Sequence, residues 1–187
     1  MSDLRINNSK QSSGLFTENN THYFISGLER PVLIFIHGVG LCSEIWEPQV
    51  EYFSKQYKVI TYDFLGHGLT PPASKSPTIE DYVEQLNDLV SSLGISSFSL
   101  IGHSMGAIIS IAYSLKYEDK INSLIPLNIV YKRSSDARDQ VLDRANKILQ
   151  TREIGNIEQT MSRWFKNIRG PDQTEKINKV RQLLLSA

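Results

Sequence analysis

The chain has 187 residues, and its 20 basic and 20 acidic side chains leave no net charge. This balance excludes the basic footprint of a nucleic-acid-binding protein and gives no attraction to an acidic membrane surface. The apolar runs are far shorter than the ~20 residues of a membrane-spanning helix, and the polar N-terminus lacks the apolar region of a signal peptide. The single cysteine, Cys42, excludes an internal disulfide and favours a reducing, cytoplasmic location.

The chain begins with residues rich in Ser, Asn and Gln, so we expect a mobile lead-in over 1–20. Further on, runs of branched and aromatic residues predict strands, and apolar residues spaced three and four apart predict helices. In chain order these are an edge strand at 22–26, a strand at 31–36, a helix interrupted by Pro48 at 43–56, a strand at 57–62, a helix at 79–93, a strand at 98–101, a helix at 105–117 and a strand at 124–130.

Strands that alternate with helices predict an α/β fold with a mostly parallel sheet covered on both faces. The last third differs, because it contains only amphipathic helical patterns, at 136–150, 156–165 and 172–185. We therefore divide the chain into a lead-in (1–20), an α/β core (21–133) and a helical segment (134–187).

The most specific motif is a Gly-x-Ser-x-Gly sequence at 102–106, which follows a predicted strand and opens a predicted helix. A serine at the apex of such a strand–turn–helix unit is typical of a nucleophile elbow, in which strained backbone holds the hydroxyl out of the sheet. The two glycines leave room for neighbouring backbone. The motif predicts that Ser104 is a catalytic nucleophile.

A second glycine-containing turn, His37–Gly40, follows the buried strand at 31–36. A turn in this place can aim a backbone N–H at the space above a nucleophile, so we expect the N–H groups of Val39 and Met105 to form an oxyanion hole. His37 itself is expected to be structural.

Neither glycine turn matches a dinucleotide-binding or phosphate-binding pattern. The histidines are dispersed and the only cysteine has no partner, so no cluster of metal ligands emerges. We therefore expect no cofactor and no metal.

Both motifs, together with the segment Asp63–Thr70 of the form Asp-x-x-Gly-x-Gly-x-Thr, occur in the order and at about the spacing of the α/β-hydrolase fold family. The chain resembles the small bacterial esterases and enol-lactonases of this family, firmly over 20–130 and loosely beyond. The resemblance implies that Asp63 stabilises its loop. It also implies that the helical segment is a cap over the nucleophile, in which Trp164 and Phe165 either line the substrate pocket or anchor the cap helix to its neighbours.

The catalytic base is missing from its expected place. A serine nucleophile needs a base and an orienting acid, and in this fold they follow the serine in the order acid, then histidine. All of the four histidines precede Ser104: His22, His37, His67 and His103. The family uses the loop of His67 structurally, so we do not expect it to replace the base. None of the nine acidic residues after Ser104 is assigned as the acid.

The resemblance implies a hydrolase of small carboxylic esters or lactones that forms an acyl-enzyme on Ser104. The same fold also hosts acyltransferases, cofactor-free haloperoxidases and C–C bond hydrolases. Two interpretations of the missing base stay open. The favoured one is that these residues are the N-terminal part of a longer hydrolase.

In the other interpretation the short chain is a catalytically inactive fragment or an interaction module, or half of an enzyme that another chain completes. A sheet that ended at the strand 124–130 would expose an apolar edge to self-association or to pairing with another chain.

Overall fold

The computed structural model describes residues 14–73, 76–129, 131–151, 157–168 and 170–186. The strands in these ranges are β1 (Leu15–Phe16), β2 (His22–Gly27), β3 (Val32–Ile36), β4 (Lys58–Tyr62), β5 (Phe98–His103) and β6 (Ile121–Leu127). They form a six-stranded sheet in the order β1-β2-β4-β3-β5-β6. The pairs β4–β3, β3–β5 and β5–β6 are parallel, whereas β1 and β2 pair antiparallel. The prediction of an α/β fold with a mostly parallel sheet is confirmed.

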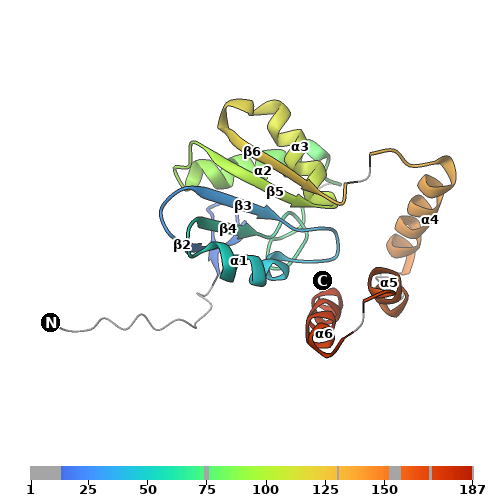
Figure 1. Cartoon of the computed structure of the whole chain (residues 1–187). Helices are drawn as coiled ribbons and strands as arrows, with labels where there is room; N and C mark the ends of the chain where they lie inside the picture. The colour runs from blue at the N-terminus through green and yellow to red at the C-terminus, as the bar shows by residue number, and fades with distance from the viewer. Residues whose placement is uncertain (1–13, 74–75, 130, 152–156, 169, 187) are drawn as a thin grey trace.

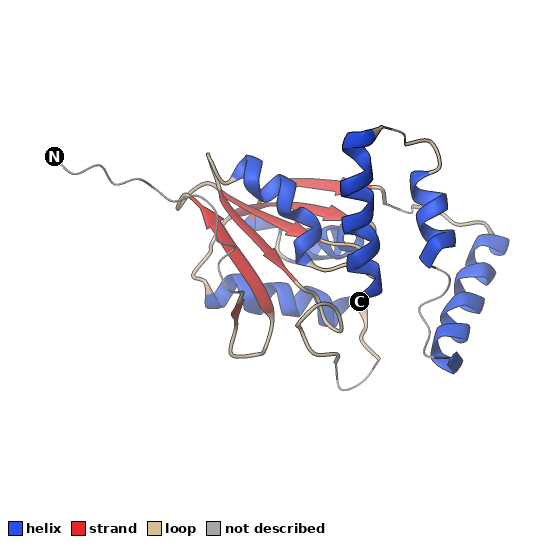
Figure 2. Cartoon of the chain, turned by 90° about the horizontal axis from the view of Figure 1, so that it is seen from below, coloured by secondary structure: helices blue, strands red, loops and turns tan. Residues whose placement is uncertain are grey.

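Helices from the first two thirds of the chain cover both faces of the sheet, and the three helices of the last third lie beyond the carboxyl ends of the strands (Figures 1 and 2). The helices are the 3₁₀ helix η1 (Ser43–Trp46), α1 (Glu47–Phe53), α2 (Ile79–Ser92), α3 (Met105–Lys116), the 3₁₀ helix η2 (Glu118–Lys120), α4 (Ser135–Thr151), α5 (Ile157–Phe165) and α6 (Pro171–Leu185). The helix predicted at 43–56 forms as two pieces, η1 and α1, which meet next to Pro48. Pro48 lies in the first turn of α1, where a proline removes no helical hydrogen bond. Thr78 and Asp81 form a capping box at the start of α2.

Both faces of the central strands are apolar, which is why helices cover both. Ile34 and Ile36 of β3 belong to the larger core layer, with side chains of α2 and α3. Phe35, between them in the sequence, belongs to the smaller layer with Trp46 of η1, because successive side chains of a strand point to opposite faces. The continuous apolar run therefore fills two cores at once.

The N-terminal edge differs from the prediction. The expected edge strand forms as β2, but it is an inner strand, because Leu15–Phe16 pairs with it antiparallel. This short strand lies inside the segment that we expected to be a mobile lead-in. Residues 1–13 of that segment lie outside the described residues.

At the other side of the described sheet, β6 is the last strand. It begins and ends three residues earlier than predicted, because Ile121 and Ser123 pair with Phe98 and Ser99 of β5, and Asn122 between them is the extra residue of a register shift. Ile125, Leu127 and Ile129 are 46%, 40% and 38% exposed, whereas Val130 lies outside the described residues. Self-association through this edge stays a prediction, which light scattering at increasing protein concentration would test.

The helical segment consists of α4, α5 and α6, and all three begin and end close to the predicted positions. Figure 1 shows them beyond the carboxyl ends of β3 and β5, on the side of the sheet where the two glycine-containing motifs lie. In the described part of the chain, no helix combines the length and the apolar character needed to cross a membrane.

Candidate active site

Ser104 connects β5 to α3 in a backbone conformation that non-glycine residues rarely adopt, with φ of 55° and ψ of −112°. The flanking glycines are required by close backbone contacts. A Cβ on Gly102 would lie 2.2 Å from the carbonyl oxygen of Gly106, and a Cβ on Gly106 would lie 2.3 Å from that of Ile36. This is the geometry that the motif predicted for a nucleophile elbow.

The elbow is also held from β6, a contact that the sequence did not indicate. The backbone N–H of Ser104 donates a hydrogen bond to the carbonyl of Leu127, at 3.0 Å. The end of β6 therefore determines where the serine backbone lies.

Residues 38–41 form a turn, here called the oxyanion turn, after β3. The N–H of Leu41 donates to the carbonyl of Gly38 at 3.3 Å, and Gly40 has φ of 75°, as the third position of a type II turn requires. A Cβ on Gly38 would lie 3.3 Å from the Cβ of Ser104, so the turn rests against the elbow.

Val39 and Met105, the two expected oxyanion donors, therefore belong to adjoining pieces of backbone. Met105 is the first residue of α3, where a helix leaves its N–H groups without intrahelical partners. Among the described residues, neither Val39 nor Met105 has a hydrogen-bond acceptor for its backbone N–H. Both donors are thus available to a bound oxygen.

His37 supports the oxyanion turn from within the core. Its ring is buried, its Nδ1 donates to the carbonyl of Gly38 at 2.9 Å, and its Nε2 accepts the N–H of Phe64 at 3.3 Å. The ring also stacks on Phe64, with centroids 4.0 Å apart. Burial lowers the pKa of His37 to about 4, so the ring is neutral near pH 7. With both nitrogens occupied, His37 is structural, as predicted.

Asp63, directly after β4, connects three parts of the chain through hydrogen bonds to its carboxylate. Its carboxylate accepts hydrogen bonds from the N–H of Ser43 (2.7 Å), the N–H of Leu69 (3.0 Å) and Nδ1 of His22 (2.7 Å). Burial by itself would raise the pKa of Asp63, but these hydrogen bonds outweigh burial and lower that pKa. The role that the resemblance implied for Asp63, stabilising its loop, agrees with these contacts.

The structure brings no general base to Ser104. His67 donates from Nδ1 to the carbonyl of Leu65 at 3.2 Å and packs on Phe64. His103 is half-buried, and burial lowers its pKa. Within the described ranges, no side-chain hydrogen bond joins Ser104 to a histidine or to a carboxylate. In the described part of the chain, the site therefore combines the strained backbone of Ser104 with two unpaired backbone N–H groups, and no base is hydrogen-bonded to the serine.

Trp164 and Phe165, the residues weighed for a substrate pocket, lie at the end of α5 in different surroundings. Trp164 is 40% exposed. Phe165 packs against a small apolar group, here called the anchor cluster, formed by Leu41, Met161, Leu183 and Leu184. The anchoring interpretation fits Phe165, and a pocket role for either residue stays a prediction.

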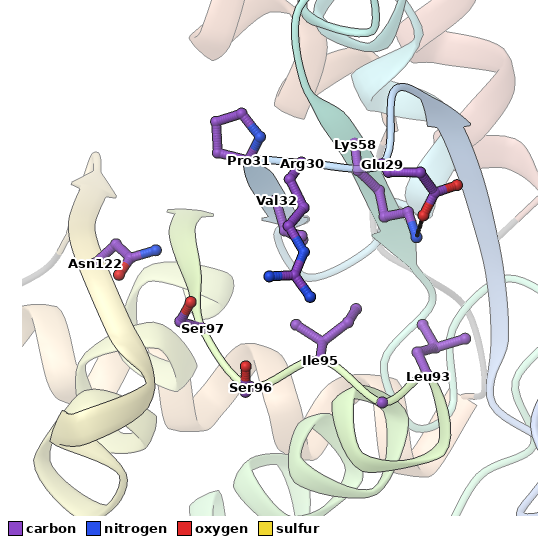
Figure 3. A pocket seen from close by; sticks show the side chains of 11 residues that line it. Glu29, Arg30, Pro31, Val32, Lys58, Leu93, Ile95, Ser96, Ser97 and Asn122 are labelled. Atoms are coloured by element: carbon purple, nitrogen blue, oxygen red, sulfur yellow. Dashed lines mark hydrogen bonds and ion pairs between the residues drawn. The ribbon is translucent and has the colours of Figure 1, made fainter.

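A polar depression of about 440 Å³ lies at the opposite end of the sheet (Figure 3). Arg30 points into it, Ser96 and Ser97 line it, and the ion pair between Lys58 and Glu29 (3.0 Å) closes one side. Arg30 precedes β3, Lys58 begins β4, and Ser96 and Ser97 precede β5, whereas the oxyanion turn and Ser104 follow β3 and β5. The depression is therefore separate from the candidate active site. No three His, Cys, Asp or Glu side chains of the described ranges come together as metal ligands would.

Comparison with known proteins agrees with this fold. The sequence profile of the alpha/beta hydrolase fold family matches residues 31–181. The chain therefore belongs to the α/β-hydrolase family.

Among its relatives is an (E)-2-((N-methylformamido)methylene)succinate hydrolase of Acinetobacter baylyi, 37% identical over 163 residues, which are 87% of this chain and 59% of the relative. Similar solved structures include a thermophilic esterase of Thermogutta terrifontis (TM-score 0.76, 27% identity, 93% of this chain and 65% of that one). An enol-lactonase of Burkholderia xenovorans shares the fold (TM-score 0.71, 23% identity, 88% and 64%). The chain thus spans about three fifths of the length of the Acinetobacter relative.

Proposed function

We propose that this chain supplies the nucleophile and the oxyanion hole of a serine hydrolase that cleaves small carboxylic esters or lactones. The observation that carries the proposal is the strained backbone of Ser104 next to the unpaired N–H groups of Val39 and Met105. Preorganised donors of this kind stabilise the charge that develops on the carbonyl oxygen when a nucleophile attacks.

In the proposed reaction, Oγ of Ser104 attacks the carbonyl carbon while its proton passes to a base. The two N–H groups hold the oxyanion, and the alkoxide leaves with the proton that the base returns. Water then attacks the acyl-enzyme in the same way and releases the acid. Because no histidine follows Ser104 and His37 is fully engaged, we propose that the base and its orienting acid come from outside residues 1–187.

The identity to the Acinetobacter protein favours a second substrate class, an N-acylated aminomethylene succinate. The bond cleaved is then C–N rather than C–O, but the attack on a carbonyl and the need for an oxyanion hole are the same. Hydrolysis assays that compare a simple ester, a lactone and an N-acyl enamine dicarboxylate distinguish the two classes.

The nucleophile is tested by intact-mass measurement of labelling with a fluorophosphonate, with and without added imidazole as a substitute base. We expect slow labelling of the 187-residue protein and faster labelling with imidazole, because the elbow and the donors are already in place. Ser104→Ala must not label in either condition. A folded protein that stays unlabelled even with imidazole would support the alternative of an inactive interaction module.

The oxyanion donor is tested by a pair of substitutions in the turn. Val39→Pro removes the N–H, while proline suits the second position of a type II turn; Val39→Ala keeps the N–H. We expect Val39→Pro to slow imidazole-assisted labelling by about 10²–10³-fold, the usual effect of losing one donor. Equal labelling of the two variants would exclude Val39 as a donor.

A further inference from the structure

The oxyanion turn has few hydrogen bonds of its own. A single long backbone hydrogen bond closes it, from Leu41 to Gly38 at 3.3 Å. Val39 at its tip is 60% exposed. Such a turn needs support from outside to keep one conformation, and an oxyanion donor is useful only when its position is settled before the reaction.

That support comes from the far end of the chain. Leu41, the last residue of the turn, is only 4% exposed because it packs in the anchor cluster with Met161 of α5 and with Leu183 and Leu184 of α6. Cδ2 of Leu184 lies 3.5 Å from the position that a Cβ on Gly40 would occupy. The C-terminal end of α6 therefore lies directly against the turn.

Two surface ion pairs also join α6 to its neighbours. Lys179 of α6 pairs with Glu47 at the start of α1. Arg181 of α6 pairs with Glu158 of α5 through two hydrogen bonds, of 2.8 and 3.3 Å. The first joins α6 to the segment that follows the oxyanion turn, and the second makes α5 and α6 one unit.

On the side toward the sheet, the same stretch of backbone is held by buried polar groups. His37 donates to the carbonyl of Gly38 (2.9 Å), and Asp63 accepts the N–H of Ser43 (2.7 Å). Residues 38–43 thus lie between a polar support from the core and an apolar support from the helical segment.

We infer that Leu184 is a positioning residue: by packing on Gly40 and Leu41 it holds the oxyanion turn, and with it the N–H of Val39, in place. The claim that Leu184 positions an oxyanion donor rests on the proposed function, whereas the claim that it holds the turn in one conformation does not. It assigns the end of α6 a task beyond covering a pocket, since Leu184 is the side chain of α6 that lies against Gly40 and packs with Leu41.

The experiment compares two neighbouring leucines. Leu184→Ala removes a buried contact of the anchor cluster, whereas Leu185→Ala, at a position that is 59% exposed, changes the same helix without touching the turn. Hydrogen exchange of the Leu41 amide reports on the turn, and the NMR resonance of the Val39 amide reports on the donor. The Met105 amide serves as the control on the elbow side.

For Leu184→Ala we expect the Leu41 amide to exchange about tenfold faster or more and the Val39 resonance to shift, while the Met105 resonance stays. Leu185→Ala should leave all three unchanged. Leu184→Met, which conserves volume, should restore both readouts. If Leu184→Ala loosens α6 but leaves Leu41 and Val39 as in the wild type, the inference is wrong.

A milder variant, Leu184→Val, gives a smaller change in the same direction if the alanine variant does not fold. Imidazole-assisted fluorophosphonate labelling then tests the catalytic part, and we expect it to slow in Leu184→Ala and to recover in Leu184→Met. If the wild type does not label, the proposed function fails, while hydrogen exchange at Leu41 still decides whether Leu184 holds the turn.

Discussion

The sheet with α1–α3 and the helical segment are built in opposite ways. In the first region, apolar side chains on both faces of the strands are buried, and the carboxylate of Asp63 binds three donors. In the described part of the helical segment, the buried side chains are Met161, Leu183 and Leu184. The comparison teaches that the sheet region creates the geometry of the elbow, whereas the helical segment reaches the site through the small anchor cluster and one surface ion pair.

The largest expected effect is that of removing the carboxylate at the centre of the sheet region. Asp63→Ala leaves His22 and two backbone N–H groups without their acceptor, and should lower the free energy of unfolding by about 3–5 kcal/mol. Asp81→Ala, which removes an exposed helix cap, should lower the free energy of unfolding by much less. Urea denaturation measures both. Similar losses would mean that the buried network is no stronger than a surface cap.

Acid should destabilise the sheet region through its buried histidine. The unfolded chain binds a proton at His37 near the ordinary pKa of 6.5, but the folded protein binds it only near pH 4. The stabilisation is therefore complete above pH 6.5 and is lost as the pH falls to about 4, a change of about 3 kcal/mol.

Burial also lowers the pKa values of His67 and His103, which act in the same direction. The pKa of Asp63 is lowered from 3.8, so its contribution to stability is lost only below about pH 4, outside the range in which His37 titrates. Denaturant unfolding at pH 7, 6, 5 and 4 measures the effect, and His37→Gln should flatten the pH dependence. A stability that is constant over this range would contradict the neutral buried ring.

In the helical segment, two neighbouring aromatic residues should behave differently. Phe165→Ala removes a contact with the anchor cluster and should cost about 1–3 kcal/mol, less than the ~3–5 kcal/mol of a fully buried phenylalanine. Trp164→Ala, at a position that is 40% exposed, should change stability by about 0.5 kcal/mol or less. Helical unfolding followed by circular dichroism measures both variants. A large loss for Trp164→Ala would show that it anchors α5 as well.

The last expected effect has the opposite sign. Ser104→Gly relieves the backbone strain of a residue with φ of 55°, worth about 1–3 kcal/mol, and this gain exceeds the cost of a freer unfolded chain, about 0.4–1 kcal/mol. The variant should therefore be more stable by about 1 kcal/mol, and labelling should be abolished. Ser99→Gly, within β5, serves as the control and should destabilise. If Ser104→Gly also lowers the free energy of unfolding, the backbone of Ser104 is not strained in the folded protein.

Much of this molecule follows from local patterns. The run from Val32 to Ile36 could be predicted as a buried strand because apolar residues on both faces need helices on both faces. The geometry of Ser104 could be predicted because Gly102 and Gly106 stand where neighbouring backbone comes too close to leave room for a side chain. Where polar residues form a strand, as at Asn122 and Ser123, the prediction was wrong about its start.

The sequence by itself thus determined the α/β class, the order of its strands and helices, and Ser104 as the candidate nucleophile, because periodicity and glycine spacing act between near neighbours. Only the tertiary structure decided that Leu15–Phe16 joins the sheet, that the carbonyl of Leu127 holds the serine backbone and that Leu184 lies on the oxyanion turn. These contacts join residues far apart in the chain, and they form only after the strands and helices have packed, so no short stretch of sequence records them.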